Sequence, residues 1–209
     1  LPILPLRNTV AFPFSMMPLA VGLRRSIKLI EDAMQGSRFI GLVAMKDPSI
    51  EEPMPGEVHE VGTVAVINKV VHTPEGALQV IVQGLERIKI HRWVATEPYL
   101  KAETSVSPDQ VVSSLELEAL RRSLLDLTAK VVQFMPQLPN EAMELVRRVE
   151  DPRFLVYLIA ANVKMEMADA QELLAHDTVD AKMRKLIGVL SHELEVLQLG
   201  QKIQSEAQS

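Results

Sequence analysis

Val61-Gly-Thr-Val-Ala-Val-Ile-Asn-Lys-Val-Val71 and Ala77-Leu-Gln-Val-Ile-Val-Gln83 are two apolar runs that flank the short segment Thr73-Pro-Glu-Gly76. Both runs are rich in β-branched residues, which favour strands, and the segment between them contains the Pro and Gly that are typical of turns. Two such runs around a short turn predict a β-hairpin. This hairpin assigns the first part of the chain to β structure.

The residues around the hairpin continue the same pattern. Residues 1–105 hold 7 of the 9 glycines and 9 of the 13 prolines, and dense Gly and Pro between short apolar runs are typical of strands joined by turns. Further strands are expected over Leu1–Leu6, Phe39–Met45 and Tyr99–Val106. Ser26 is expected to cap one short helix that ends at Gly36. We expect a small mixed barrel or sandwich with about six strands.

Residues 106–209 have the pattern of a helical bundle. Ser107-Pro-Asp-Gln110 combines an N-cap serine, a proline at the first helical position and a glutamine that completes a capping box. Apolar residues then recur every three or four positions up to Phe134, which predicts a long amphipathic helix. Shorter helices are expected over Asn140–Glu150, after Asp151-Pro152, and over Ala168–His176. The last helix is expected from near Asp177 almost to the chain end.

The final helix carries an apolar stripe from Val179 to Leu197, and we expect it to pack on the helix that carries Leu117–Phe134 and then to project beyond the bundle. The sequence therefore predicts an α+β fold. A β-rich domain over 1–105 with one helix precedes an α-helical bundle over 106–209 that ends in a long helix.

Composition and missing motifs exclude most catalytic classes. The 209 residues have a formal net charge of −5 and no cysteine, and no apolar run approaches the roughly 20 residues that span a bilayer. Neither a phosphate-binding Gly-x-x-x-x-Gly-Lys-Ser/Thr loop nor a Gly-x-Ser-x-Gly nucleophile motif occurs, and the five histidines do not fall at metal-ligand spacing. We therefore expect a non-catalytic binding protein with no metal and no cofactor of its own.

Two apolar segments are candidate binding sites for polypeptides. Phe14, Met16 and Met17 lie in a proline-containing stretch, Phe12–Pro18, which we expect to form a stiff loop outside the sheet. Flexible Met side chains adapt to varied apolar partners. Met135 and Leu138, between two predicted helices, form a second candidate. The opposing interpretation is that Phe12 and Phe14 plug the end of the barrel, as large aromatics usually do.

A basic stripe supports a function of another class. Arg87, Lys89 and His91 alternate along one strand and face the same side, so they could bind phosphates. Such a stripe is also typical of the solvent face of an edge strand. A nucleic-acid-binding module is therefore the main alternative, and a purely structural assembly domain is a third.

Several segments, in order along the chain, resemble the N-terminal domain of the bacterial Lon-type ATP-dependent proteases. They are Leu4-Pro-Leu-Arg-Asn-Thr-Val-Ala-Phe-Pro13, Met17-Pro-Leu-Ala-Val-Gly22, Gly62-Thr-Val-Ala65, Gly84-Leu-Glu-Arg-Ile88, Asp151-Pro152, Gln171-Glu-Leu-Leu174 and Leu194-Glu-Val-Leu197. No single segment is specific, but their order across nearly the whole chain is.

This resemblance implies a PUA-like pseudo-barrel followed by a helical bundle. It implies recognition of unfolded or damaged protein clients and assembly with ATPase and protease modules in a cytoplasmic homo-hexamer, with no membrane association. In that family ATP and Mg²⁺ are used, and the Ser–Lys proteolytic dyad lies further along the parent protein. No catalytic residue can therefore be assigned to this chain. The family's link to DNA belongs to whole enzymes and indicates no surface here.

Overall fold

The computed structural model describes residues 1–209, which divide into two compact units, Leu1–Pro108 and Asp109–Ser209. The boundary lies three residues beyond the one that the sequence suggests at 105/106. The first unit contains β1 (Ile3–Leu6), β2 (Met16–Val21), α1 (Arg24–Met34), β3 (Phe39–Ala44), the 3₁₀ turn η1 (Pro55–Glu57), β4 (Val61–His72), β5 (Leu78–Ala95) and β6 (Lys101–Val106). The second contains α2 (Leu115–Val132), α3 (Ala142–Arg148), α4 (Pro152–Asn162), α5 (Met167–Ala175) and α6 (Val179–Gln208).

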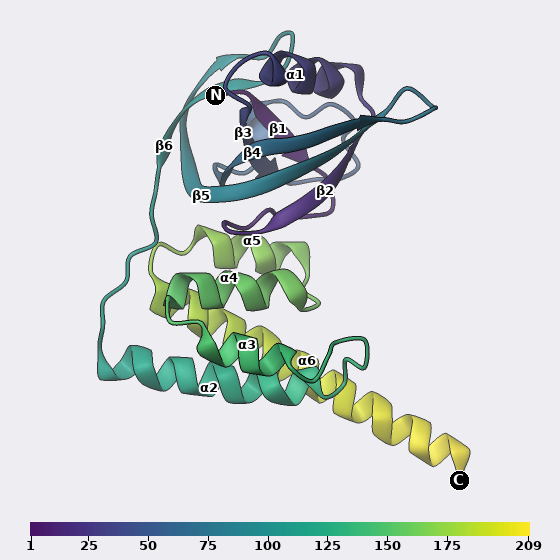
Figure 1. The fold of residues 1–209 in the computed structure, drawn as a ribbon, viewed down its shortest axis with the longest axis vertical. Coiled ribbons are helices and arrows are strands. Elements are labelled where there is room, and N and C mark those ends of the chain that lie inside the picture. The colour runs from purple at the N-terminus through teal and green to yellow at the C-terminus, as the bar shows by residue number, and fades with distance from the viewer. The chain divides into compact units, whose positions relative to one another are not determined.

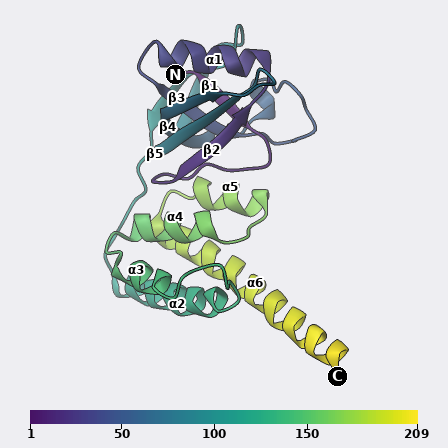
Figure 2. The ribbon, with the colours of Figure 1, turned by 45° about the vertical axis from the view of Figure 1, so that its right-hand side comes forward.

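The strands form one sheet in the order β1-β3-β4-β5-β2, with β6 also paired to β5. β1 runs parallel to β3, and every other strand pair is antiparallel. A bridge between Pro2 and Lys101 joins the start of β1 to β6, so β1, β3, β4, β5 and β6 close into a ring. The predicted pseudo-barrel is confirmed, and α1 lies across one end of it (Figures 1 and 2).

The β4–β5 hairpin is the longest pairing in the sheet, as the sequence predicts. Its turn uses Gly76 at φ 87°, a left-handed conformation that glycine adopts without steric cost. β5 then continues for 18 residues in all, so it pairs with β2 through its first part and with β6 through its last part. One long strand thereby connects the two ends of the barrel.

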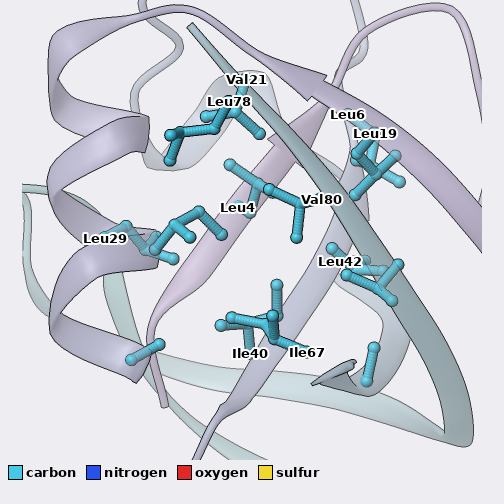
Figure 3. Close-up of a cluster of buried hydrophobic side chains, with 14 of the residues drawn as sticks. Leu4, Leu6, Leu19, Val21, Leu29, Ile40, Leu42, Ile67, Leu78 and Val80 are labelled. Atoms are coloured by element: carbon cyan, nitrogen blue, oxygen red, sulfur yellow. The ribbon is translucent and has the colours of Figure 1, made fainter. Parts of the chain in front are cut away.

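The core of the barrel is aliphatic. Figure 3 shows Leu4 and Leu6 from β1, Leu19 and Val21 from β2, and Leu29 from α1 around the same buried cluster. A smaller buried cluster takes the alternate residues of β1 and β3, and it gathers Ile3, Val43, Met45, Val58, Ile90, Leu100 and Ala102. Both clusters draw on alternate residues of the strands, because successive side chains of a strand point to opposite faces.

The start of α1 differs from the prediction. Leu23, not Ser26, is the N-cap residue, and the Ile27 N–H already donates to the Leu23 carbonyl at 2.9 Å. The helix begins as soon as the chain leaves β2 at Gly22, which leaves no linker for Ser26 to cap. The end of β2 therefore determines where α1 begins, although Ser26 fits the local capping pattern.

The helical unit is built around α2 and α6. Both helices bury an apolar stripe against each other, and α6 buries Val179, Met183, Leu186, Leu190 and Leu194. Beyond Leu194 the α6 side chains are exposed or half-buried, and the helix projects from the bundle (Figure 1). The predicted packing and projection of the last helix are both confirmed.

The predicted helix start at Ser107–Gln110 is wrong. The Gln110 N–H donates to the Asp177 carbonyl at 2.9 Å, and the Gln110 carbonyl accepts from the Val179 N–H at 3.0 Å. These bonds hold the segment extended, so α2 begins only at Leu115. Ser114 is the actual cap, and its hydroxyl accepts from the Leu117 N–H at 3.1 Å.

A buried charged cluster lies where the bundle begins. The Lys182 ammonium lies 3.3 Å from Asp109 Oδ1 and donates to the carbonyls of Leu173 and Leu174, each at 2.8 Å. The Tyr157 hydroxyl donates to Asp109 Oδ2 at 2.6 Å, and the ammonium stands over the tyrosine ring. The cluster fixes the first residue of the unit to α4, to the end of α5 and to α6.

Candidate functional site

The predicted apolar loop is only partly a loop. Met16 and Met17 belong to β2, which pairs with β5, and Pro18 lies opposite Ile81 in that pairing. The expectation that prolines keep this stretch out of the sheet is therefore wrong. β2 is an edge strand. A proline is tolerated on the open side of an edge strand because no neighbouring strand there needs its N–H as a hydrogen-bond donor.

The pleat of β2 separates the two methionines. Met16 is 62% exposed, whereas Met17 packs against the barrel core. Of this pair, the structure therefore presents Met16 to solvent and uses Met17 mainly for packing.

The two phenylalanines before β2 face inward to different extents. Phe12 is buried, which agrees with the plug interpretation for this residue. Phe14 is half-buried with φ at 67°, and its N–H donates to the Gly84 carbonyl at 3.0 Å. A side chain at Gly84 would meet the Phe12 carbonyl at 2.4 Å, so close packing of backbone on backbone holds this segment.

The second candidate segment lies between α2 and α3. Met135 and Leu138 are both half-buried, and the Leu138 N–H donates to the Met135 carbonyl at 3.1 Å in a tight turn. Leu145 on α3, which the sequence pattern did not single out, is 63% exposed. The role of this segment stays a prediction.

The predicted basic stripe is exposed only in part, because Arg87 is buried, Lys89 is half-buried and His91 is exposed. Arg87 is buried, and its guanidinium donates to the carbonyl and hydroxyl oxygens of Ser107, both at 3.0 Å. His91 is exposed but lies 2.5 Å from the Ser105 hydroxyl through Nε2. The prediction of a solvent or phosphate-binding face fails at Arg87 because the chain after β6 covers this part of β5. The observation removes Arg87 from the basic face on which the nucleic-acid alternative rests.

The first unit contains a cavity of about 540 Å³ that the sequence did not indicate. Its walls come from β1, β2, the first turns of α1, the segment around Met45–Pro53, and the Tyr99–Leu100 pair. These segments are far apart in the sequence, so no local pattern could have revealed the cavity. Five of the labelled side chains in Figure 3, Leu4, Leu6, Leu19, Val21 and Leu29, also line it.

The polar side chains at the cavity already have hydrogen-bond partners within the protein. Arg7 donates to the backbone carbonyls of Pro48 and Glu51, and Arg25 donates to the carbonyl of Thr96. The Tyr99 hydroxyl donates to the Asp32 carboxylate at 2.8 Å. Because these polar groups already have partners, the surface that the cavity offers to a ligand is mainly aliphatic, which suits the binding of apolar groups.

Tyr99 and Asp32 influence each other's ionisation. Burial raises the pKa of Tyr99 to about 12, and the hydrogen bond to the Asp32 carboxylate adds to the same effect. The pKa of Asp32 is lowered, first by the hydrogen bond from Tyr99 and then by that from Lys28, whose ammonium lies 3.1 Å away. At neutral pH the pair is a neutral phenol that donates to a carboxylate.

The structure shows neither a metal-binding cluster nor a helix suited to a membrane. No group of three or more His, Asp or Glu side chains lies close enough together to hold a metal ion. None of the helices combines the length and the apolar character needed to cross a lipid bilayer.

A pseudo-barrel with an apolar cavity, followed by a helical bundle, defines an α+β binding domain. A family profile described as the ATP-dependent protease La (LON) substrate-binding domain matches residues 1–192. Lon protease 1 of Herpetosiphon aurantiacus is 43% identical over 99% of this chain, and Lon protease of Dictyoglomus thermophilum is 37% identical over 100% of it. The chain spans 26% of the length of each of these relatives.

A solved structure agrees with this match. The N-terminal domain of the Mycobacterium avium complex Lon protease superimposes with a TM-score of 0.74 at 21% identity, covering 91% of this chain and 97% of that one. At this identity the likeness supports the fold. The chain belongs to the Lon substrate-binding domain family, as the resemblance of its sequence segments indicates.

Proposed function

We propose that this chain recognises protein substrates for an ATP-dependent protease by binding apolar segments that unfolded or damaged clients expose. The single observation that carries the proposal is the family match over residues 1–192, whose family is defined by substrate binding. In a native client such segments are buried, so a surface that binds only exposed apolar side chains discriminates by folding state rather than by sequence.

The energetics favour weak contacts used several times. Burying one large apolar side chain contributes about 1.5–3 kcal/mol, and part of that is lost to ordering the partner. A single domain therefore binds a client weakly. Several copies in one assembly would raise the affinity through avidity. This is why a homo-hexamer is part of the proposal.

The remaining properties are proposed for the parent protein. ATP, Mg²⁺ and a serine nucleophile would act in modules outside this chain, in the cytoplasm, and any DNA binding would be a property of the whole enzyme. The chain itself would neither hydrolyse ATP nor cleave a substrate. Turnover by the purified chain above a matched blank, persisting after repurification, would refute this part.

Binding of an unfolded probe tests the function. We expect reduced, carboxymethylated α-lactalbumin to bind the chain and native α-lactalbumin not to bind, with little dependence on salt because the contacts are apolar. Met16→Ser should weaken binding several-fold, while Met54→Ser, a matched change at another exposed methionine, should not. Met17 is left intact because it packs on the core. Equal binding of native and unfolded protein would contradict the proposal, and a steep loss with salt would favour phosphate or charge recognition instead.

A further inference from the structure

The cavity lies at the two ends of the sheet. β1 and β2 terminate the hydrogen-bonded order of strands, and residues of both line the cavity, including Leu4 and Leu19. β2 pairs along one side only, with β5. β1 pairs with β3 along one side, and on the other side only its first residues are bonded, to Leu100–Ala102, so the edge from Leu4 onward is open. Open strand edges usually bind further strands, so a client segment could in principle be added there as a new strand.

Prolines prevent that mode. Pro5 lies within β1 and Pro18 within β2, and both line the cavity. Proline has no N–H, so a strand added to either edge would lack a donor near the middle of a short ladder. β1 has only 4 residues and β2 only 6, which leaves few other pairing positions. Recognition at this cavity must therefore depend on side chains rather than on backbone pairing.

The chemistry of the walls indicates which side chains fit. Leu29 and Val21 are almost fully buried and line the cavity together with Leu4, Leu6 and Leu19. The guanidinium groups of Arg7 and Arg25 already donate to backbone carbonyls, so they stand as a polar rim. A volume of about 540 Å³ is within the usual range of ligand sites and is ample for an aromatic ring.

We propose that this cavity is the pocket that receives one large apolar side chain, such as that of Phe, from an extended client segment, with the Pro5 and Pro18 edges keeping the segment out of the sheet. The inference rests on the proposed function and deepens it by naming where and how a client residue is bound. The client backbone would then run across the opening of the cavity, and the affinity would depend on the client sequence at the one position whose side chain enters it.

A glycine offers a way to block the pocket without disturbing the fold. Gly22 lines the cavity and is exposed, and a Cβ built on it would meet no atom within 4 Å. Gly22→Trp should therefore fill the mouth. Gly56 has the same open surroundings but does not line the cavity, so Gly56→Trp is the matched control.

The probe is a short acetylated and amidated Gly/Ser peptide that carries one central Phe and a fluorophore, compared with the same peptide carrying Ala. We expect the Phe peptide to bind the wild-type chain at least tenfold more tightly than the Ala peptide. Gly22→Trp should remove about tenfold or more of that affinity, and Gly56→Trp should leave it unchanged. Thermal unfolding of both variants should match the wild type. Methyl NMR of the wild-type chain should show contacts from the Phe ring to Leu19 and Leu29.

The outcomes separate the two proposals. If the wild type binds unfolded α-lactalbumin and Gly22→Trp binds the Phe peptide as well as the wild type does, the pocket is wrong and the general function stands. Phe contacts that map to methyl groups outside the cavity lead to the same conclusion. If the wild type binds neither unfolded protein nor peptide, the proposed function fails and the pocket fails with it. Should Gly22→Trp unfold the chain, the NMR contacts alone decide.

Discussion

Replacing Asp109 by Ala should destabilise the helical unit, because it leaves the Lys182 ammonium buried without its carboxylate. The side chains of Lys182 and Asp109 are 1% and 4% exposed, and Nζ lies 3.3 Å from Oδ1. Removing one partner of a buried ion pair typically costs about 3–5 kcal/mol. Lys182 retains two carbonyl acceptors at 2.8 Å, so we expect the lower end, a loss of about 3 kcal/mol in the free energy of unfolding.

Urea unfolding followed by far-ultraviolet circular dichroism measures this loss, since most helical residues belong to the second unit. Asp169→Ala is the matched control, because it removes the carboxylate that lies 2.8 Å from Lys185, a more exposed lysine on the same helix. That change should cost no more than about 1 kcal/mol. A double change, Asp109→Leu with Lys182→Met, should recover most of the stability. If Asp109→Ala costs no more than Asp169→Ala, the reasoning is refuted.

Three further predictions concern other parts of the chain. A chain ending after Gly188 lacks two buried leucines of α6, and the loss of each should cost about 2–5 kcal/mol of the free energy of unfolding. The melting temperature should therefore fall, and an unchanged melting transition would contradict this packing. Gly84→Ala should cost about 1–3 kcal/mol by denaturant unfolding, because its Cβ would stand 2.4 Å from the Phe12 carbonyl oxygen, whereas Gly56→Ala should be tolerated. Absorbance titration against Tyr99→Phe should place the Tyr99 pKa at about 12. The stability gained from the neutral phenol should be full below the ordinary pKa of about 10 and be lost as pH rises through about 12; titration at the ordinary value would contradict this.

Patterns that act over a few residues predicted most of the fold. The turn at Thr73–Gly76 and the Asp151-Pro152 cap depend on local backbone chemistry, and both occur as expected. The spacing of apolar residues also identified the long last helix. The capping pattern at Ser107 failed because Gln110 pairs with residues nearly seventy positions later, which no local window can include.

The candidate site was less predictable than the fold. Composition indicated apolar loops and edges, but whether a methionine is exposed depends on strand pairing: Met16 and Met17 are adjacent, and the pleat separates them. Alternation along β5 suggested that Arg87 faces solvent, and only the path of the chain after β6 shows that it does not. The cavity requires five segments at once and has no counterpart in any single stretch of sequence.

The contact between the first and last strands of the barrel sets the order in which this domain can mature during synthesis. The Ala102 N–H donates to the Leu1 carbonyl at 3.0 Å, and the Ile3 N–H donates to the Leu100 carbonyl at 2.9 Å. A ribosome adding about 5–20 residues per second needs about 5–20 s to make the intervening hundred residues. During that interval β1 has no β6 to close against, and its leucines stay accessible to chaperones. A domain proposed to recognise unfolded or damaged proteins would therefore itself be incompletely folded for several seconds of its own synthesis.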